Sequence, residues 1–392
     1  MFELKKDINP TLSDRLALPL VLAGYGIRNF TLQVLERALF ANKNIFTAQR
    51  ILVFRKGGMG DAVSALPAIL AIKNRFSNTE IDLLTARRLP TQAGLEEIAE
   101  QGTFANVYTY TNLFDRDMIS QLRKRKYDLY IELPSNIASF SFELRTLWLV
   151  KRVGIPSGIG WRVSSTKFLA KKQEKLLSFF SDKDRLLKIL NRYGFDVEYD
   201  YQLNVPKKDE EFVNKLLKEQ GITLKDRNIA MMPGAGRPQN KWPLPFFNEV
   251  AKYYLAKGFN IILIGGEEER SEAEKIEGEN VFNFCGKLTA MQSAAMLKSC
   301  CLSISNDTGP MHLSYSAGTP VVAIFSARDY AGKWFPPKEG NIILRNTDVP
   351  CAICFSDTCM DNICMKQIMP EDVIKAADKL LTSKPIIMKE TV

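Results

Sequence analysis

The chain has 392 residues, and its 46% hydrophobic and 25% charged content is that of an ordinary globular protein. A chain of this length is expected to fold into two domains, each with its own core. The formal net charge of +9 favours an anionic partner, namely an acidic membrane surface or a phosphorylated substrate. We expect no nucleic-acid partner, because neither a zinc finger nor an aromatic RNA-binding motif is present.

Residues 1–49 are predicted to form a helical extension ahead of the first domain. Thr31–Leu39 carries apolar residues at helical spacing, and we expect this segment to pack on its own protein; a membrane-surface role is the alternative. The longest early apolar run, Leu16–Ile27, contains Pro19 and two glycines and is too short to cross a bilayer. We therefore expect a cytoplasmic protein, whose membrane contact, if any, is peripheral and on the cytoplasmic face of the inner membrane.

An alternation of strands and helices defines an N-terminal domain over residues 50–205. Its predicted strands are Ile51–Phe54, Ile81–Thr85, Val107–Tyr110 and Tyr127–Leu133. Strands that alternate with helices predict a parallel sheet with helices on both faces, the α/β, Rossmann-like class. Between residues 151 and 192 the sequence has eleven Lys or Arg and three acidic residues, which concentrates positive charge there. This basic stretch is either a solvated helix face or a binding surface.

The segment Val197–Lys208, which contains Pro206, is predicted to be the linker, and a second domain with alternating strands and helices extends over residues 206–368. Its predicted strands are Ile229–Met232, Asn260–Ile264, Val281–Phe284, Leu302–Ser305 and Val321–Phe325. The remaining residues, 369–392, include a predicted helix from Pro370 to Leu381, because proline and the acids that follow it suit a first helical turn. We expect this last helix to pack back on the N-terminal domain.

The first predicted strand turns into a helix through Gly57-Gly58-Met59-Gly60-Asp61. This turn is not the G-x-G-x-x-G dinucleotide fingerprint, because its third glycine comes too early, and a nicotinamide oxidoreductase is therefore not expected. A carboxylate at this helix start lies over the carboxyl edge of the sheet, where α/β proteins bind ligands. Asp61 is thus either a helix N-cap or a general base, and Gly58 and Gly60 let a substrate or another backbone approach closely.

A second turn, after the strand Ile229–Met232, has the features of a phosphate site. Gly234 and Gly236 expose backbone N–H groups, and Arg237 and Lys241 add positive charge beside them. The alternative is a surface loop with ordinary cations. Farther along, three consecutive acids follow Gly265-Gly266; one of them would accept ribose hydroxyls, or all three would stabilise a helix dipole.

A third turn, Asp307-Thr308-Gly309, again joins a strand directly to a helix. Unpaired N–H groups and the helix dipole make such a turn suitable for phosphate, with a capped helix start as the alternative. Pro310 has no N–H to donate and sets the first helical turn. His312, the only histidine of the chain, either contacts a phosphate oxygen or orders the turn.

In this order, G-G-x-G-D, P-G-A-G-R-P-x-x-K-W-P and N-D-T-G-P-M-H-L with G-T-P-V-V-A-I-F resemble the motifs of glycosyltransferase family 9, the ADP-heptose:lipopolysaccharide heptosyltransferases. The resemblance runs from about Arg50 to Leu381. It implies a GT-B fold, with two Rossmann-like domains facing a central cleft: an acceptor-binding N-terminal domain and a nucleotide-sugar-binding C-terminal domain.

The resemblance also implies roles for individual residues. Asp61 would deprotonate the acceptor hydroxyl, and Lys241 with the backbone around Thr308 and Gly309 would hold the donor diphosphate. Glu269 would contact the ribose. The acceptor would lie against basic residues of the N-terminal domain, such as those between 151 and 192.

We therefore predict an inverting glycosyltransferase that moves a sugar, heptose by resemblance, from a nucleoside-diphosphate donor such as ADP-heptose to a lipopolysaccharide-core or related anionic glycan acceptor. It would need no cofactor. Two D-x-D strings, which start at Asp115 and Asp182, each enclose a basic residue and lie away from the donor turns, so neither is assigned a metal. The alternatives are a sugar-nucleotide epimerase or hydrolase on a GT-B scaffold, or a non-catalytic relative that acts as a binding protein.

Four cysteines lie close together near the end of the chain, at Cys351, Cys354, Cys359 and Cys364. This density is typical of a four-cysteine zinc or iron site, and reduced structural thiols or disulfides are the alternatives. We assign no metal to them. Cys285, Cys300 and Cys301 are predicted to be core residues.

Overall fold

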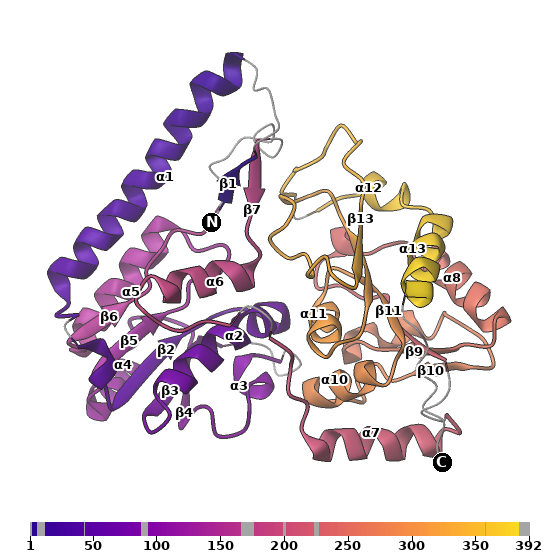
Figure 1. The fold of residues 1–392 in the computed structure, drawn as a ribbon, viewed down its shortest axis with the longest axis horizontal. Coiled ribbons are helices and arrows are strands. Elements are labelled where there is room, and N and C mark those ends of the chain that lie inside the picture. Colours follow the sequence, from indigo (N-terminus) through magenta and orange to yellow (C-terminus); the bar gives the residue numbers. More distant parts are fainter. Residues whose placement is uncertain are drawn as a thin grey trace. The chain divides into compact units, whose positions relative to one another are not determined.

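The computed structural model describes residues 2–5, 12–42, 44–87, 93–165, 176–198, 201–222, 227–356 and 358–383, with the side chains of residues 12–17 and 383 left aside. The chain forms two compact units (Figure 1). The N-terminal unit comprises Met1–Tyr201 with Ala331–Lys333, and the C-terminal unit comprises Gln202–Tyr330 with Trp334–Val392. The division after residue 201 lies four residues before the expected domain boundary, and the short segment 331–333 was not expected in the first unit.

The N-terminal unit contains a five-stranded sheet in the order β4-β3-β2-β5-β6, and every neighbouring pair is parallel. Its strands are β2 (Arg50–Phe54), β3 (Glu80–Ala86), β4 (Asn106–Tyr110), β5 (Leu129–Glu132) and β6 (Ser157–Ile159). Its helices are α2 (Met59–Arg75), α3 (Leu95–Ile98), α4 (Arg116–Arg125), α5 (Phe140–Val153) and α6 (Asp182–Asn191). The expected parallel sheet is therefore confirmed. A short antiparallel pair, β1 (Phe2–Leu4) with β7 (Leu177–Phe179), was not expected.

The helical extension forms α1 (Leu12–Leu39), which packs against α5. Leu32 is fully buried in the core that α4 and α5 build on one face of the sheet, and the ring of Phe40 stacks on Trp161 at 5.2 Å. The prediction that the extension packs on its own protein is thus confirmed for one side of the helix. Of the described residues, no helix combines the length and apolarity needed to cross a membrane.

The C-terminal unit contains a six-stranded parallel sheet in the order β10-β9-β8-β11-β12-β13. Its strands are β8 (Asn228–Met232), β9 (Asn260–Leu263), β10 (Val281–Asn283), β11 (Leu302–Asn306), β12 (Val321–Phe325) and β13 (Asn341–Arg345). Its helices are α7 (Lys207–Glu219), α8 (Leu244–Ala256), α10 (Ala290–Lys298), α11 (Gly309–Ser316), α12 (Ile363–Lys366) and α13 (Pro370–Ser383). After β9 the three consecutive acids form a 3-10 turn, η4 (Glu267–Glu269), and one short helix, α9 (Arg270–Ala273), follows.

Alternate residues of the buried strands face opposite layers of the C-terminal unit, as the pleat requires. Val322 and Ile324 of β12 lie in the core beneath α8 and α13, whereas Val321 and Ala323 pack with Met311 of α11. Because both faces are covered, these strands consist of continuous apolar runs.

The last helix, α13, buries its apolar face in the core of the C-terminal unit. Val373 and Ala377 of α13 are fully buried in the core of that unit, where the helix packs against α8 and strands β11, β12 and β13. At the helix surface, Asp378 accepts hydrogen bonds from Tyr253 (2.8 Å) and Tyr254 (3.0 Å) of α8. This differs from the expectation that the helix packs on the N-terminal domain, because its apolar stripe matches the open side of its own sheet.

Candidate active site

Both sheets have a point at which the strand order reverses. In the N-terminal unit the chain passes from β2 to β3 and β4 on one side and later adds β5 on the other. In the C-terminal unit β8 is followed by β9 and β10 on one side, and β11 pairs on the other. Open parallel sheets bind ligands at the carboxyl edge of such a point. The turns after β2 and β5, and those after β8 and β11, are therefore the candidate ligand sites.

The turn after β2 is shaped around the side chain of Asp61. Gly57 has a φ of +139°, and a Cβ atom there would lie 2.2 Å from Cγ of Asp61. Only glycine fits at this position, because another side chain would be strained and would collide. Gly58 is the N-cap of α2, and Asp61 lies within the first turn of that helix. The N-cap alternative for Asp61 is thus wrong, and the space beside Gly57 is filled by Asp61 itself.

A buried guanidinium positions this carboxylate. Nη2 of Arg55 lies 3.3 Å from Oδ1 of Asp61 and 2.5 Å from Oδ2 of Asp182, and it donates to the Asp61 carbonyl at 2.9 Å. Arg185 pairs with the other oxygen of Asp182 at 2.6 Å. The side chain of Asp182 is fully buried, whereas that of Asp61 is 24% exposed. Of these two carboxylates, Asp61 is therefore the one that reaches solvent.

The same arrangement separates the pKa values of the two carboxylates. Burial raises the pKa of Asp61 to about 6, against the opposing attraction of Arg55 and with a further increase from Asp182. Burial also acts on Asp182, but Arg55 and Arg185 together hold the pKa of that carboxyl below its ordinary value. A partly exposed carboxylate with a pKa near neutrality can accept a proton at physiological pH.

Three further titratable groups, Glu132, Glu143 and Lys56, lie near the end of β5. Burial raises the pKa of Glu132 to about 7 and raises that of Glu143 well above its ordinary value. Tyr130 donates to Glu132 at 2.5 Å. Burial lowers the pKa of Lys56, which lies over the ring of Phe142 at 3.4 Å.

Three residues of this site were not predicted from the sequence, namely Arg55, Asp182 and Arg185. Arg55 directly follows a buried strand, which was the available signal. Arg185 belongs to the basic stretch between residues 151 and 192, where it was counted only as a charge, and Asp182 was considered only as the start of a D-x-D string. Asp115, the start of the other D-x-D string, is the N-cap of α4 and accepts from Met118 N–H at 2.8 Å.

In the C-terminal unit, Asn306 at the end of β11 holds the loop that follows β8. Its amide donates to the carbonyls of Pro233 (2.7 Å) and Gly234 (3.2 Å) and accepts from the Trp242 N–H (3.0 Å). The loop that carries Gly236, Arg237 and Lys241 is thereby fixed beside the turn after β11. Gly236 and Arg237 are exposed.

Glu269 lies against two glycines of neighbouring strand ends. A Cβ atom on Gly234 would come within 1.8 Å of its Oε1, and one on Gly265 within 2.4 Å of its Oε2. The Gly266 N–H donates to the same carboxylate at 2.8 Å. Burial raises the pKa of Glu269, which the Gly266 hydrogen bond and the charge of Lys241 partly oppose. Lys241 itself forms an ion pair with Glu272 of α9.

The turn after β11 combines a half-buried acid, Asp307, with a helix start that is also half-buried. Burial, together with Asp329, raises the pKa of Asp307 to about 7, and Asn240 donates to that carboxyl at 3.0 Å. Thr308 is the N-cap of α11 but makes no capping hydrogen bond with its side chain, and Gly309 is the first helical residue. The N-terminal N–H groups of α11 are thus not capped by this side chain.

His312 lies inside the unit. It is 3% exposed, and its Nδ1 lies 3.1 Å from the hydroxyl of Tyr315. Its ring meets that of Trp334 edge to face at 5.9 Å. These contacts suit a residue that orders the turn.

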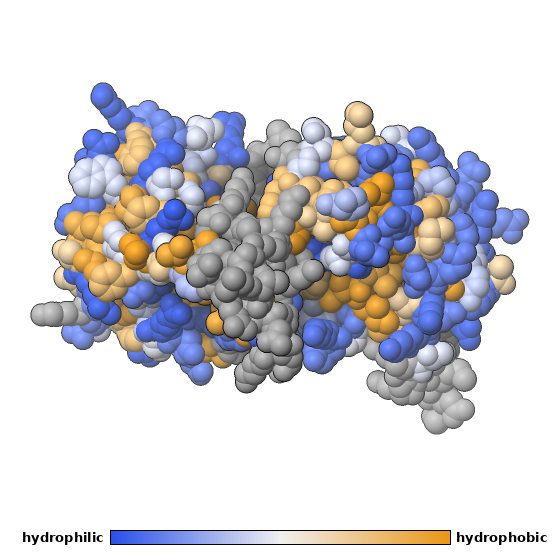
Figure 2. Space-filling model, turned by 90° about the horizontal axis from the view of Figure 1, so that it is seen from above, coloured by the Kyte–Doolittle hydropathy of each residue, from blue (hydrophilic) through white to orange (hydrophobic). Residues whose placement is uncertain are grey.

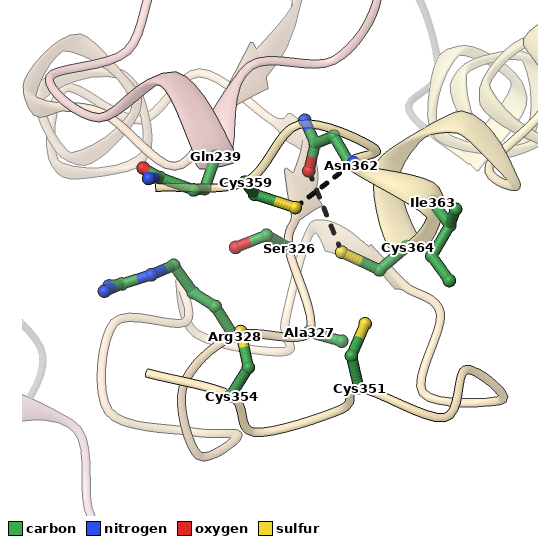
Figure 3. A pocket seen from close by; sticks show the side chains of 10 residues that line it. All are labelled: Gln239, Ser326, Ala327, Arg328, Cys351, Cys354, Cys359, Asn362, Ile363 and Cys364. Atoms are coloured by element: carbon green, nitrogen blue, oxygen red, sulfur yellow. Dashed lines mark hydrogen bonds between the residues drawn. The ribbon is translucent and has the colours of Figure 1, made fainter. Parts of the chain in front are cut away.

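The four clustered cysteines line one small cavity of about 20 Å³ (Figure 3). All four are free thiols, and the backbone N–H groups of Ser356 and Asn362 point at the sulfurs of Cys354 (3.5 Å) and Cys359 (3.2 Å). Burial, with smaller contributions from its three neighbours, raises the pKa of Cys364. Across the described ranges, no three His, Cys, Asp or Glu side chains are grouped so as to hold a metal ion. Of the other cysteines, Cys285 and Cys300 are buried as expected, but Cys301 is exposed.

The family description "glycosyltransferase family 9 (heptosyltransferase)" matches residues 116–364, more than half of the chain. The chain belongs to glycosyltransferase family 9. It is therefore a glycosyltransferase, as the motifs predicted. The matched residues include every candidate residue of the C-terminal unit, whereas the turn that contains Asp61 precedes them.

Named relatives of this family 9 glycosyltransferase cover most of its length. It is 26% identical over 351 residues to lipooligosaccharide heptosyltransferase 2 of Campylobacter jejuni, with 85% of the chain and 99% of the relative covered. It is 23% identical over 301 residues to lipopolysaccharide heptosyltransferase 2 of Salmonella typhimurium, with 70% and 82% covered.

Solved structures of family 9 proteins share its fold. A family 9 glycosyl transferase from Veillonella parvula matches with a TM-score of 0.66 at 21% identity, covering 86% of this chain and 98% of that one. The Escherichia coli ADP-heptose lps heptosyltransferase II matches with a TM-score of 0.63 at 18% identity, covering 85% and 99%. The family 9 chain therefore has the GT-B fold, with two Rossmann-like units.

Proposed function

We propose that this family 9 glycosyltransferase moves heptose from ADP-heptose to the core of a lipopolysaccharide or a related anionic glycan, with inversion at the anomeric carbon. The observation that carries the proposal is Asp61, a partly exposed carboxylate held by a buried guanidinium, with a pKa raised to about 6. Support for the substrates comes from the heptosyltransferase relatives and from the fold shared with the Escherichia coli ADP-heptose lps heptosyltransferase II.

In the proposed reaction Asp61 accepts the proton of an acceptor hydroxyl. The oxygen of that hydroxyl forms a bond to the anomeric carbon as the bond from this carbon to the β-phosphate oxygen breaks. Attack from the face opposite the leaving group inverts the configuration. Arg55 keeps the carboxylate in place. Burial raises the pKa of Asp61, Arg55 opposes that increase, and Asp182 adds to it. The protonated acid then releases its proton to solvent.

ADP leaves with the electron pair of the broken bond, so negative charge grows on its phosphate oxygens. We assign the stabilisation of this charge to Lys241, to the loop that contains Gly234, Gly236 and Arg237, and to the N-terminal N–H groups of α11 after Thr308. Lys241 is paired with Glu272 in the structure, and the diphosphate would replace that partner. Glu269 would accept hydrogen bonds from the ribose hydroxyls.

The substitution Asp61→Asn tests the base, because it preserves shape and removes proton acceptance. With ADP-heptose and a lipopolysaccharide-core acceptor, we expect kcat to fall at least about 100-fold while the affinity for ADP stays within about twofold. Turnover near the wild-type rate would contradict the assignment of Asp61. NMR of the product linkage checks inversion independently.

A donor-only assay separates the alternatives. Consumption of ADP-heptose without acceptor, at a rate unchanged by added acceptor, would favour an epimerase or hydrolase. Binding of donor with no turnover under any of these conditions would favour a non-catalytic binding protein. The proposal expects rapid ADP release only when donor and acceptor are both present.

A further inference from the structure

The outward face of α1 is apolar. Leu20, Ile27, Phe30 and Val34 are 76%, 65%, 67% and 46% exposed. Their spacing of seven, three and four residues places them on one side of the helix. The exposed or half-exposed small residues Ala23, Gly26 and Ala38 lie among them. At 1.5 Å per residue, the stripe from Leu20 to Val34 is about 21 Å long.

Two polar side chains of this helix, Asn29 and Glu36, are turned inward instead. Asn29 is buried, donates to the Tyr25 carbonyl at 3.1 Å and accepts from the Val163 N–H at 3.1 Å. Glu36 is also buried and accepts from the hydroxyl of Tyr193 at 2.8 Å. A surface helix of a globular protein ordinarily has the reverse polarity. The exposed apolar stripe of α1 therefore does not contribute to the core of its own unit.

Positive charge borders the stripe. Arg28 and Arg37 are exposed, and the one acid between residues 18 and 40 is the buried Glu36. At the end of α1, Lys151 of α5 donates to the Leu39 carbonyl at 3.4 Å. Trp148, three residues before Lys151 and hence on the same side of α5, is 54% exposed. Tryptophan and basic side chains beside an apolar stripe are typical of helices that lie in a membrane interface.

Figure 1 shows α1 as a long helix along the N-terminal unit, and hydrophobic residues gather on the surface of that unit at the left of Figure 2. We propose that the outward face of α1 binds the surface of an anionic lipid bilayer and lies parallel to it. Leu20, Ile27, Phe30 and Val34 enter the acyl boundary, while Arg28 and Arg37 contact lipid phosphates. The chain's net charge of +9 adds to the attraction.

A lipid surface fits this face better than a second copy of the chain. Two copies that met through the same stripe would bring Arg37 and the other cations of both copies into one interface, and the one acid of α1 between residues 18 and 40, Glu36, is buried. An anionic bilayer instead brings negative charge to this face. The inference does not depend on the proposed function, because lipid vesicles without any glycan test it.

The test is flotation of the full chain with vesicles of phosphatidylcholine that contain about 30% phosphatidylglycerol, against pure phosphatidylcholine. We expect binding to the anionic vesicles that weakens at least about fivefold between about 0.1 and 0.5 M salt, because salt screens surface charge. The double variant Ile27→Glu with Phe30→Glu should bind at least about tenfold more weakly. The matched control, Phe212→Glu, changes a 43% exposed phenylalanine on α7 and should bind as the wild type does.

Equal binding by the wild type and by the Ile27→Glu/Phe30→Glu variant would overturn the proposal, as would the absence of any vesicle binding. Light scattering of the protein without vesicles tests whether a second copy of the chain covers the stripe instead. A dimer that this double variant dissociates, together with no vesicle binding, would show that a second copy covers the stripe and would also overturn it. Because the substituted side chains are exposed, the melting temperature of each variant should stay within a few degrees of the wild type.

Discussion

Because Asp61 is largely buried, ionisation of its carboxyl group should lower the free energy of unfolding. Its folded pKa of about 6 lies above its ordinary value of 3.8. Between these two values the folded state binds a proton that the unfolded state has released. Stability is therefore lost as the pH rises through this window, and the full loss is present above about pH 6. The difference in pKa corresponds to about 3 kcal/mol.

Replacement of Asp61 by asparagine removes this titration. At pH 7.5 the variant should be more stable than the wild type by about 1–3 kcal/mol. The gain can fall to the lower end of this range because an amide interacts with Arg55 less favourably than a carboxylate does. At pH 4 the difference should nearly vanish, since the wild-type group is then protonated when folded. Titrating groups that do not interact with Asp61 cancel when the two proteins are compared at each pH.

Thermal or urea unfolding at both pH values measures this difference. For a unit of this size the gain in stability corresponds to a rise in Tm of about 2–12 °C. The control is Glu100→Gln, which removes a 47% exposed partner of Lys73 and should change stability by less than about 1 kcal/mol at either pH. The reasoning is refuted if the difference in unfolding free energy between Asp61→Asn and the wild type is no larger at pH 7.5 than at pH 4.

Three further predictions concern the same turns. The pH profile of kcat/KM should rise with pH and level off above an apparent pKa of about 6, because the proposed base must be ionised; a flat profile from pH 5 to 8 would contradict this. Lys241→Met should weaken ADP binding about 10- to 100-fold by calorimetry, whereas Lys257→Met, which breaks a surface pair with Asp378, should leave it unchanged. Gly57→Ala should destabilise the protein by at least about 2 kcal/mol in urea unfolding, and Gly58→Ala, with open space around its Cβ, by less than about 1 kcal/mol.

The sequence predicted the layers of the fold because buried parallel strands are continuous apolar runs separated by helices. The strand β13, at one edge of its sheet, was not predicted, whereas β10 at the other edge was, although the residues of both strands are half-buried. The last helix was recognised as a helix, but the unit on which it packs depends on which surface its apolar stripe fits. No local pattern encodes that choice.

The candidate site was predictable only in part, for a similar reason. Glycines and polar residues after β2, β8 and β11 stand out because a turn beside a buried strand needs special residues. The partner of Arg55 is separated from it by 127 residues, so no spacing rule connects Arg55 to Asp182. The apolar residues of α1 are likewise visible in the sequence, but only the inward hydrogen bonds of Asn29 and Glu36 show which side is left outside.

The position of α13 after all six strands of its sheet has a consequence for synthesis on the ribosome. This helix contributes Val373 and Ala377 to the core of the C-terminal unit, yet it is made after every strand that it covers. Until α13 emerges, its side of the six-stranded sheet is covered only in part, by α8, and the nascent chain exposes part of an apolar layer that invites chaperone binding or aggregation. The emergence of α13 is therefore the earliest moment at which this unit can finish folding.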